Sequence, residues 1–180
     1  TGPSAPWNEI GLSEDPAVEL LERFGYTHVS AEDLDRERAS LLDVVLTTRL
    51  EAALKRLNPW LNDGNLQRAI REVTHVPAAS LLDANEKLYT TLTRGISVTQ
   101  DLGHGSRGQQ VRYFDFVAPR HNDLVVTRQL RIKGAKKHII PDLVLYVNGV
   151  PLAVIECKSP TIGEKWEHEA IDQLLRYQEL

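Results

Sequence analysis

Apolar residues in the first half of the chain recur at every third or fourth position, which is the spacing of one face of an α-helix. A first helix is predicted to begin at Asp15-Pro16, which supplies a capping side chain and a favourable first residue. Gly25 is expected to end it, because glycine commonly follows the last helical residue. Three more helices are expected, over 30–57, around 65–73 and around 80–94, the first of them stopped by Asn58-Pro59.

From Gly95 onward the pattern changes to short runs of β-branched and aromatic residues, which predict strands. Asn148-Gly149 is a strong signal for a tight turn between two very apolar runs. Helices first, then a sheet of about four or five strands, then a helix predict an α/β or α+β layered fold. The expected strands cover 96–99, 111–118, 124–132, 143–147 and 150–155, and the closing helix runs from about 163 to 180.

The composition narrows the classes of protein to consider. The 180 residues suffice for one domain with a sizeable core, and no apolar run approaches the ~20 residues of a membrane helix. The start of the chain lacks a secretory signal, and a single cysteine suits a reducing compartment, so a cytoplasmic location is expected. A net charge of −4 requires any nucleic-acid contact to come from a local patch. The absence of methionine and the helical ending suggest a fragment of a longer protein.

Three charged residues flank the apolar hairpin, namely Asp142, Glu156 and Lys158. Buried strands do not normally carry charges unless those charges are paired or bind something. Glu156 and Lys158 are two residues apart, so they share a face of the strand, while Cys157 points the other way into the core. A two-residue loop would place Asp142 on the face opposite Glu156. A single site therefore requires a three-residue loop or a bulge in the hairpin.

Such a grouping would have a definite chemistry. Two carboxylates at close range repel each other, and a divalent cation removes that penalty. Oxygen ligands with few protein contacts suit Mg²⁺, which keeps several waters and takes phosphate oxygens. A neighbouring lysine can orient a metal-bound water or stabilise charge developing on phosphate. The set fits phosphodiester hydrolysis, and the alternative is a hairpin with solvated end charges and an incidental Glu156–Lys158 pair.

A cluster of basic residues precedes the hairpin. It forms either a track for DNA phosphates or an ordinary solvated loop. Its members are Arg128, Arg131, Lys133, Lys136 and Lys137.

Asp142 followed by Glu156-Cys157-Lys158 resembles the PD-(D/E)xK nuclease motif. More specifically, the chain resembles the N-terminal nuclease domain of the R subunit of type I restriction enzymes. The similarity covers most of the chain, and the stretch PDLVLYVNGVPLAVIECKSP is its most specific part. Other similar segments are 18–26, 84–98, 114–129 and 171–178.

The resemblance implies roles for individual residues. Asp142 and Glu156 would be the metal-binding acids and Lys158 the catalytic lysine, with Glu19 of the first helix completing the metal site. Gln173 and Tyr177 match a Q-x-x-x-Y motif and would position the DNA, being four apart on one helix face. This requires the closing helix to be anchored to the sheet by apolar residues, which are Ile171, Leu174 and Leu175.

The resemblance also implies a fold and an activity. The expected fold is a single nuclease domain over 1–180, with a mainly helical part over 1–94 and a mixed β-sheet core flanked by helices over 95–180. The expected enzyme is a Mg²⁺-dependent, site-specific deoxyribonuclease that cuts double-stranded DNA. It would act with methylation and specificity subunits, away from membranes, and would use ATP only through downstream motor domains, since no G-x-x-x-x-G-K-[ST] is present. The alternatives are another PD-(D/E)xK repair or recombination nuclease, or a catalytically silent DNA-binding or subunit-docking module.

Overall fold

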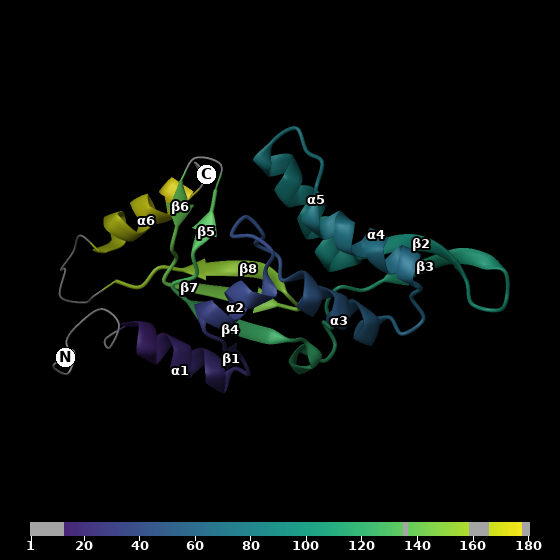
Figure 1. Ribbon diagram of the computed structural model, residues 1–180, viewed down its shortest axis with the longest axis horizontal. Helices are drawn as coiled ribbons and strands as arrows, with labels where there is room; N and C mark the ends of the chain where they lie inside the picture. The colour runs from purple at the N-terminus through teal and green to yellow at the C-terminus, as the bar shows by residue number, and fades with distance from the viewer. Residues whose placement is uncertain (1–12, 135–136, 159–165, 178–180) are drawn as a thin grey trace. The chain divides into compact units, whose positions relative to one another are not determined.

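The computed structural model describes residues 13–134, 137–158 and 166–177 of the chain (Figure 1). Backbone contacts divide the chain into two compact units. Of the described residues, those within Thr1–Val44, Leu124–Val147 and Pro151–Leu180 form unit 1, and those within Val45–Asp123 and Asn148–Val150 form unit 2. The single nuclease domain expected over 1–180 stays a prediction. The expected division at residue 94 follows the order of elements along the sequence, whereas the two units interleave both parts.

Unit 1 is built on a four-stranded sheet with the order β1-β4-β7-β8. Its strands are β1 Thr27–His28, β4 Leu124–Arg128, β7 Leu143–Val147 and β8 Val150–Ile155. β1 runs parallel to β4, and β4 runs antiparallel to β7 with Val126 opposite Leu145. The sheet is therefore mixed, and together with its helices it confirms the expected mixed α/β fold.

Burial explains why the central strands are so apolar. β4 and β7 each have a neighbour on both sides, and the side chains on both of their faces are buried. Tyr146 of β7 is fully buried, which raises the pKa of its phenol to about 12. β8 lies at the edge of the sheet, and Leu152 and Val154 remain exposed on it. Only the β7 half of the hairpin thus has the burial on both faces that its sequence suggests.

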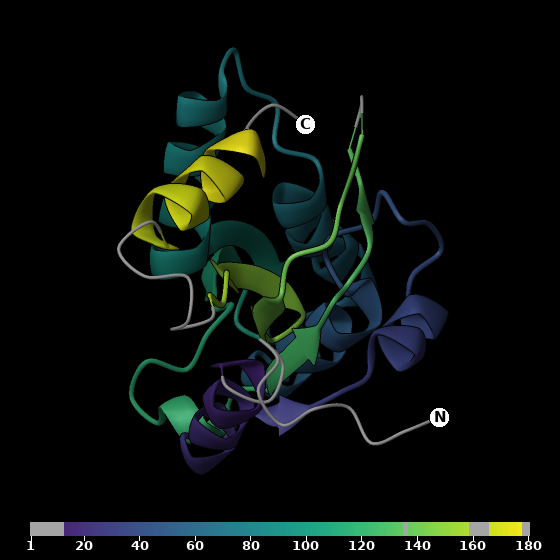
Figure 2. The same ribbon diagram turned by 90° about the vertical axis from the view of Figure 1, so that its left-hand side faces the viewer.

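The helices of unit 1 are α1 Asp15–Arg23, α2 Ala31–Glu37 and α6 Trp166–Tyr177. α1 lies beside β1 (Figure 1) and buries Val18 in a cluster with Val126, Leu143 and Cys157. The predicted core position of Cys157 is therefore confirmed. A short ribbon of β5 Ile132–Lys133 and β6 His138–Ile139 connects β4 to β7 and projects from the sheet in both views (Figures 1 and 2).

Unit 2 contains three helices and a two-stranded ribbon among its described residues. These elements are α3 Thr47–Leu57, α4 Asp63–Thr74, α5 Leu81–Arg94, β2 Ile96–Asp101 and β3 Ser106–Val111, with a short 3₁₀ turn η2 Pro119–His121. Ser80 caps α5 as its predicted start implies, because its side chain accepts a hydrogen bond from the amide of Asp83. Tyr113 is fully buried, and its hydroxyl donates a hydrogen bond to the carbonyl of Ala69 at 2.8 Å.

The expected single helix over 30–57 is wrong. It is divided into α2 and α3 by a non-helical segment. The guanidinium of Arg38 is buried and donates hydrogen bonds to the carbonyls of Asp43 and Arg131. The carbonyl of Leu41 accepts a hydrogen bond from the amide of Lys133. These long-range bonds replace helical ones, because a buried backbone or charged group must find a partner wherever it lies.

The expected strand over 111–118 is also wrong. β3 ends at Val111, and the following residues form a loop in which Asp115 accepts hydrogen bonds from the amides of Val117 and Ala118. β3 instead begins at Ser106, inside a glycine-rich stretch for which no strand was expected. Hydrogen bonds from a side chain to nearby backbone amides, such as those of Asp115, compete with strand pairing and favour turns.

The turn between β7 and β8 belongs to unit 2. Asn148 and Gly149 both have positive φ, 51° and 79°, as a two-residue type I′ turn requires. Asn148 is fully buried, and its side-chain amide donates to the carbonyl of Tyr113 at 2.8 Å, while the amide of Leu46 donates to the carbonyl of Gly149 at 2.8 Å. A Cβ at position 149 would overlap the carbonyl oxygen of Leu46, so only glycine fits there.

None of the described helices is long and apolar enough to cross a membrane.

Candidate active site

The candidate acids lie where the two strands of the hairpin end. Asp142 immediately precedes β7, and Glu156 immediately follows β8. The backbone amide of Cys157 donates a hydrogen bond to Oδ2 of Asp142 at 2.7 Å. This bond fixes the Asp142 carboxylate beside the segment that carries Glu156 and Lys158.

The odd-numbered loop or bulge that a single site was expected to require is not found at the turn. The loop has the backbone conformation of a two-residue turn. Residues 156–158 lie beyond the end of β8 and have no strand conformation. The alternation of faces within the strand therefore does not dictate where their side chains point. The expected three-residue loop is therefore wrong, because the argument for it extended the strand through Glu156.

Gln173 of α6 joins the other two charged residues. Its Nε2 donates a hydrogen bond to Oε2 of Glu156 at 2.6 Å, and its Oε1 accepts one from Nζ of Lys158 at 2.7 Å. The amide thus stands between the acid and the amine, with one polar end for each. α6 therefore brings Gln173 into contact with Glu156 and Lys158, and its predicted role in positioning DNA stays a prediction.

The packing of α6 differs from the expectation. Ile171, Leu174 and Leu175 were expected to anchor this helix to the sheet, but about half of each side chain is exposed. Tyr177 lies at the end of α6, and its side chain is outside the described residues. Its predicted role stays a prediction.

Glu14 is connected to Asp142 through Gln129. It is the residue before α1 and is only 3% exposed. The side-chain amide of Gln129 donates to Oε1 of Glu14 and to Oδ1 of Asp142, both at 3.2 Å. The amide of Gln129 also donates to the carbonyl of Asp142 at 3.1 Å. Sequence reasoning missed Glu14. The available signal was its place one residue before a predicted helix, where the helix N-terminus favours an acidic side chain.

Glu19 was expected to be the acid of the first helix at this site. Its side chain is exposed on α1, and none of the described hydrogen bonds or ion pairs joins it to Asp142 or Glu156. Val18, the neighbouring residue, points into the core cluster with Cys157. Val18 of α1 and the preceding Glu14 are therefore buried, whereas Glu19 faces solvent.

The donor set fits Mg²⁺ in type and in number. Asp142 and Glu156 supply hard carboxylate oxygens, and Mg²⁺ is usually held by one or two carboxylates together with waters and substrate phosphates. Among the described residues, no group of three or more His, Cys, Asp or Glu side chains is arranged to hold a metal ion. Glu14 therefore does not complete a three-acid cluster in this arrangement, and it reaches Asp142 through the amide of Gln129.

A basic hollow lies beside Gln173. It has a volume of about 380 Å³. Its lining residues are Lys137, His138, Ile139, Ile140, Gln173 and Arg176. Lys137 belongs to the basic cluster noted in the sequence, whereas Arg128 of the same cluster is paired with Asp15 at 2.5 Å. Lys136 lies outside the described residues. The part of the cluster that borders the candidate site is therefore its C-terminal end.

Comparison with known proteins places the chain in a family. The family model described as the N terminus of the type I restriction enzyme R protein matches residues 6–180. "Type I restriction enzyme HindI endonuclease subunit" of Haemophilus influenzae is 30% identical over 82% of this chain and 14% of its own length. "Putative type I restriction enzyme MjaIXP endonuclease subunit" of Methanocaldococcus jannaschii is 26% identical over 98% of this chain and 18% of its own length. The chain therefore spans less than a fifth of these relatives, and it belongs to the family of type I restriction enzyme R protein N termini.

Proposed function

We propose that this chain is the metal-dependent endonuclease domain of a type I restriction enzyme, and that it hydrolyses phosphodiester bonds of double-stranded DNA. The observation that carries the proposal is the continuous set of hydrogen bonds from Glu156 through Gln173 to Lys158, with Asp142 held beside it by the amide of Cys157. If the charges at the end of the hairpin were simply solvated, no side chain of a helix would be expected to bridge the acid and the amine. The same set supports catalysis over a silent docking module.

Asp142 and Glu156 would hold Mg²⁺. When bound, the ion supplies positive charge to the scissile phosphate and lowers the pKa of a coordinated water. The ammonium of Lys158 would stabilise the negative charge that develops on the phosphate oxygens. Gln173 keeps that ammonium in position through its Oε1, while its Nε2 orients the Glu156 carboxylate. The side-chain amide of Gln129 orients Asp142 in the same way.

The wider assignment rests on the family. The relatives are named as endonuclease subunits of type I restriction enzymes. A subunit of that kind would work in the cytoplasm with methylation and specificity subunits. It would be site-specific through them and ATP-dependent through motor domains outside this chain. In that assembly the present chain supplies the cutting step alone.

The test separates cutting from the rest of the enzyme. Glu156→Ala and Lys158→Ala, each introduced into the full-length subunit of the assembled enzyme, should reduce plasmid cleavage by at least roughly 10²-fold, the scale of removing one stabilising group. ATP hydrolysis on the same plasmid should be unchanged, because the two activities use different residues. Glu19→Ala is the matched control, since it removes an exposed carboxylate from the same unit. Cleavage at the parent rate by the Glu156 variant would overturn the proposal.

A further inference from the structure

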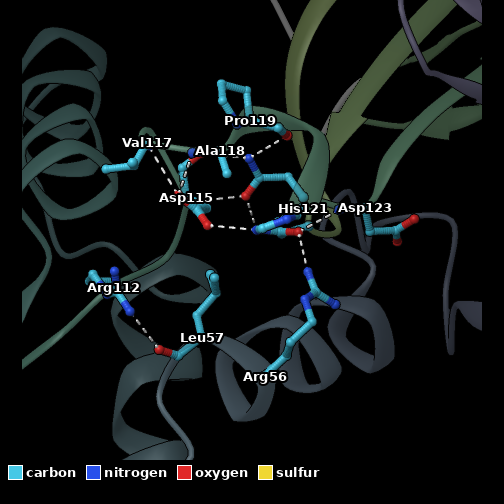
Figure 3. A network of polar contacts seen from close by, with 11 residues as sticks. Arg56, Leu57, Arg112, Asp115, Val117, Ala118, Pro119, His121 and Asp123 are labelled. Atoms are coloured by element: carbon cyan, nitrogen blue, oxygen red, sulfur yellow. Dashed lines mark hydrogen bonds and ion pairs between the residues drawn. The ribbon is translucent and has the colours of Figure 1, made fainter.

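Unit 2 has a hollow of its own, with a volume of about 260 Å³. Its polar lining includes Arg94, Gln110 and Arg112, and Phe114 and Phe116 contribute to an apolar wall. None of the described residues that line it is acidic. Neither Arg94 nor Arg112 forms an ion pair among the described residues, and a guanidinium nitrogen of Arg112 donates a hydrogen bond to the neutral carbonyl of Leu57 at 3.2 Å (Figure 3). That bond leaves the positive charge in place, so two arginines in a concave surface attract an anion.

The aromatic wall stands on a fixed loop. Phe114 is buried, whereas the ring of Phe116 is 63% exposed and Val117 is 93% exposed. The two rings meet edge to face, with their centroids 6.0 Å apart. The exposed ring of Phe116 thus packs against a buried ring of the core.

Hydrogen bonds hold this loop in shape (Figure 3). Oδ1 of Asp115 accepts from the amides of Val117 at 3.0 Å and Ala118 at 2.9 Å. Asn122 also holds the loop, because its Oδ1 accepts a hydrogen bond from the backbone amide of Asp115 at 2.8 Å. The Ala118 amide is the main reason that the pKa of the Asp115 carboxyl lies below its usual value. A loop fixed in this way presents Phe116 and Val117 at little cost in conformational entropy.

The β2–β3 ribbon continues the same surface through Gln110. Ser97 pairs with Gln110, and Thr99 pairs with Gly108, and all four residues are exposed. Paired residues of antiparallel strands share a face, so the exposed face of the ribbon is polar and uncharged at these positions. Hydroxyl and amide groups donate hydrogen bonds to phosphate oxygens. The side-chain amide of Gln110 also donates to the carbonyl of Arg94, which fixes it beside that arginine.

The charge of this segment differs from that of the whole chain, which has a net charge of −4. Residues 94–122 contain two acids, Asp101 and Asp115. Both acids are engaged by backbone amides, since Oδ1 of Asp101 accepts from Gly103 at 2.8 Å and Gly105 at 3.0 Å. The basic residues of the segment are Arg94, Arg107, Arg112 and Arg120. The surface is therefore locally positive in an acidic protein.

We propose that unit 2 binds double-stranded DNA through this surface, defined by Arg94, Ser97, Gln110, Arg112 and Phe116. The two arginines contact phosphates, the ribbon face adds hydrogen bonds to the backbone, and Phe116 packs against a sugar or a base. The proposal rests on the proposed function only in taking DNA as the ligand. It adds a holding surface that uses none of the residues assigned to cutting. An acidic protein partner would also meet the arginines, and the experiments below separate the two.

The first experiment is site-specific photo-crosslinking in the full-length subunit, with p-azidophenylalanine in place of Phe116. Tyr89, which is 67% exposed on α5 of the same unit, is the matched control position. Illumination with a labelled duplex should crosslink DNA from position 116 and not from position 89. Equal yields from the two positions, no DNA crosslink at 116, or a crosslink at 116 to another protein subunit would overturn the proposal.

The second experiment measures the salt dependence of binding to the same duplex without metal, so that no cutting occurs. Arg94→Ala combined with Arg112→Ala should weaken binding and lower the slope of log K against log salt by about 2, since each phosphate contact contributes ~0.9. Arg94→Lys combined with Arg112→Lys should keep most of the slope of the parent protein, because both positive charges remain. The control is Arg68→Ala on α4, a half-exposed arginine of unit 2. An unchanged slope in a folded double variant would overturn the proposal, with folding checked by circular dichroism.

The outcomes distinguish this surface from the cutting site. Crosslinking at 116 together with unaffected cleavage in Glu156→Ala would leave the DNA surface standing and remove the nuclease assignment. Loss of cleavage in Glu156→Ala with no crosslink at 116 would support the nuclease assignment and overturn the proposed DNA surface.

Discussion

Gln173 is the side chain that joins the acid and the amine of the candidate site. Gln173→Ala is expected to lower plasmid cleavage by roughly 10²-fold, because Lys158 loses the acceptor that positions it. Binding of Mn²⁺, measured by calorimetry, should change little, since a neutral amide donating to Glu156 is not a preferred metal ligand. Asp172→Ala, at the exposed neighbouring position of α6, should cut normally. If Gln173→Ala also cuts at the parent rate, the amide has no catalytic part.

Glu14 and Glu19 provide a test of which acid of the first helical segment serves the site. Glu14→Gln should reduce cleavage about 10- to 100-fold, the range seen when a group that orients a metal ligand is lost. Glu19→Gln should have no effect, because that side chain is exposed and has no described bond to Asp142. Cleavage by the two variants can be compared in one plasmid assay. A larger loss in Glu19→Gln than in Glu14→Gln would contradict the geometry described above.

At the scale of residues, sequence reasoning selected candidates that stand out against their surroundings. Asp142, Glu156 and Lys158 are charged residues at the ends of two apolar runs, and Gln173 follows from the resemblance. Glu14 could not be selected in this way. Its burial depends on how α1 packs against strands that are more than a hundred residues away in sequence. The bridging role of Gln129 depends on its positive φ of 51°, which nothing in the local sequence predicts.

At the scale of elements, the predictions held where local and tertiary preferences agree. The helices α4 and α5 begin close to the expected positions, because asparagine and serine caps precede regular apolar stripes. The predictions were wrong where a hydrogen bond to a distant residue determines the backbone conformation. The segment between α2 and α3 keeps an apolar periodicity, yet Arg38 and Leu41 bond to residues 131 and 133. Periodicity records which residues are apolar, and it does not record which backbone groups find partners elsewhere.

The turn of the β7–β8 hairpin can be tested by adding one methyl group. Gly149→Ala should destabilise the protein by more than ~2 kcal/mol, because it adds a clash with the Leu46 carbonyl to the ~1–2 kcal/mol cost of a left-handed alanine. Gly103→Ala is the matched control, since φ is 97° there and no atom lies within 4 Å of an added Cβ. Its cost should be limited to the conformational term. Urea denaturation of both variants measures the difference, and equal losses would show that the close approach to Leu46 is not a constraint.

At the scale of the whole molecule, the division into two units was not foreseen. The expected boundary lay between a helical part and a sheet part at residue 94, in sequence order. The structure instead moves from unit 1 to unit 2 after Val44, returns at Leu124, and assigns only Asn148–Val150 of the hairpin to unit 2. Composition and periodicity change at residue 95, but neither reveals which distant segments share contacts.

This interleaving predicts joint stability. Strands β7 and β8 lead directly out of the turn that unit 2 holds, so strain at that turn should reach both units through the covalent chain. Gly149→Ala should therefore increase amide hydrogen exchange in β7 as well as in α4, which belong to unit 1 and unit 2 respectively. Gly103→Ala should increase it in neither. Faster exchange confined to α4 would show that the units open independently.

The hairpin also limits how the family can vary in length. Asp142 and Glu156 lie at the two ends of one hairpin, so an inserted residue at Asn148-Gly149 would shift one acid past the other by a strand residue of about 3.3 Å. The tip of the β2–β3 ribbon, over Leu102–Gly105, has no such dependence and is exposed. Insertions and deletions between relatives are therefore expected to accumulate at that tip and to be excluded from the β7–β8 turn. In evolutionary terms, the length of the hairpin is constrained because it sets the relative position of the two acids.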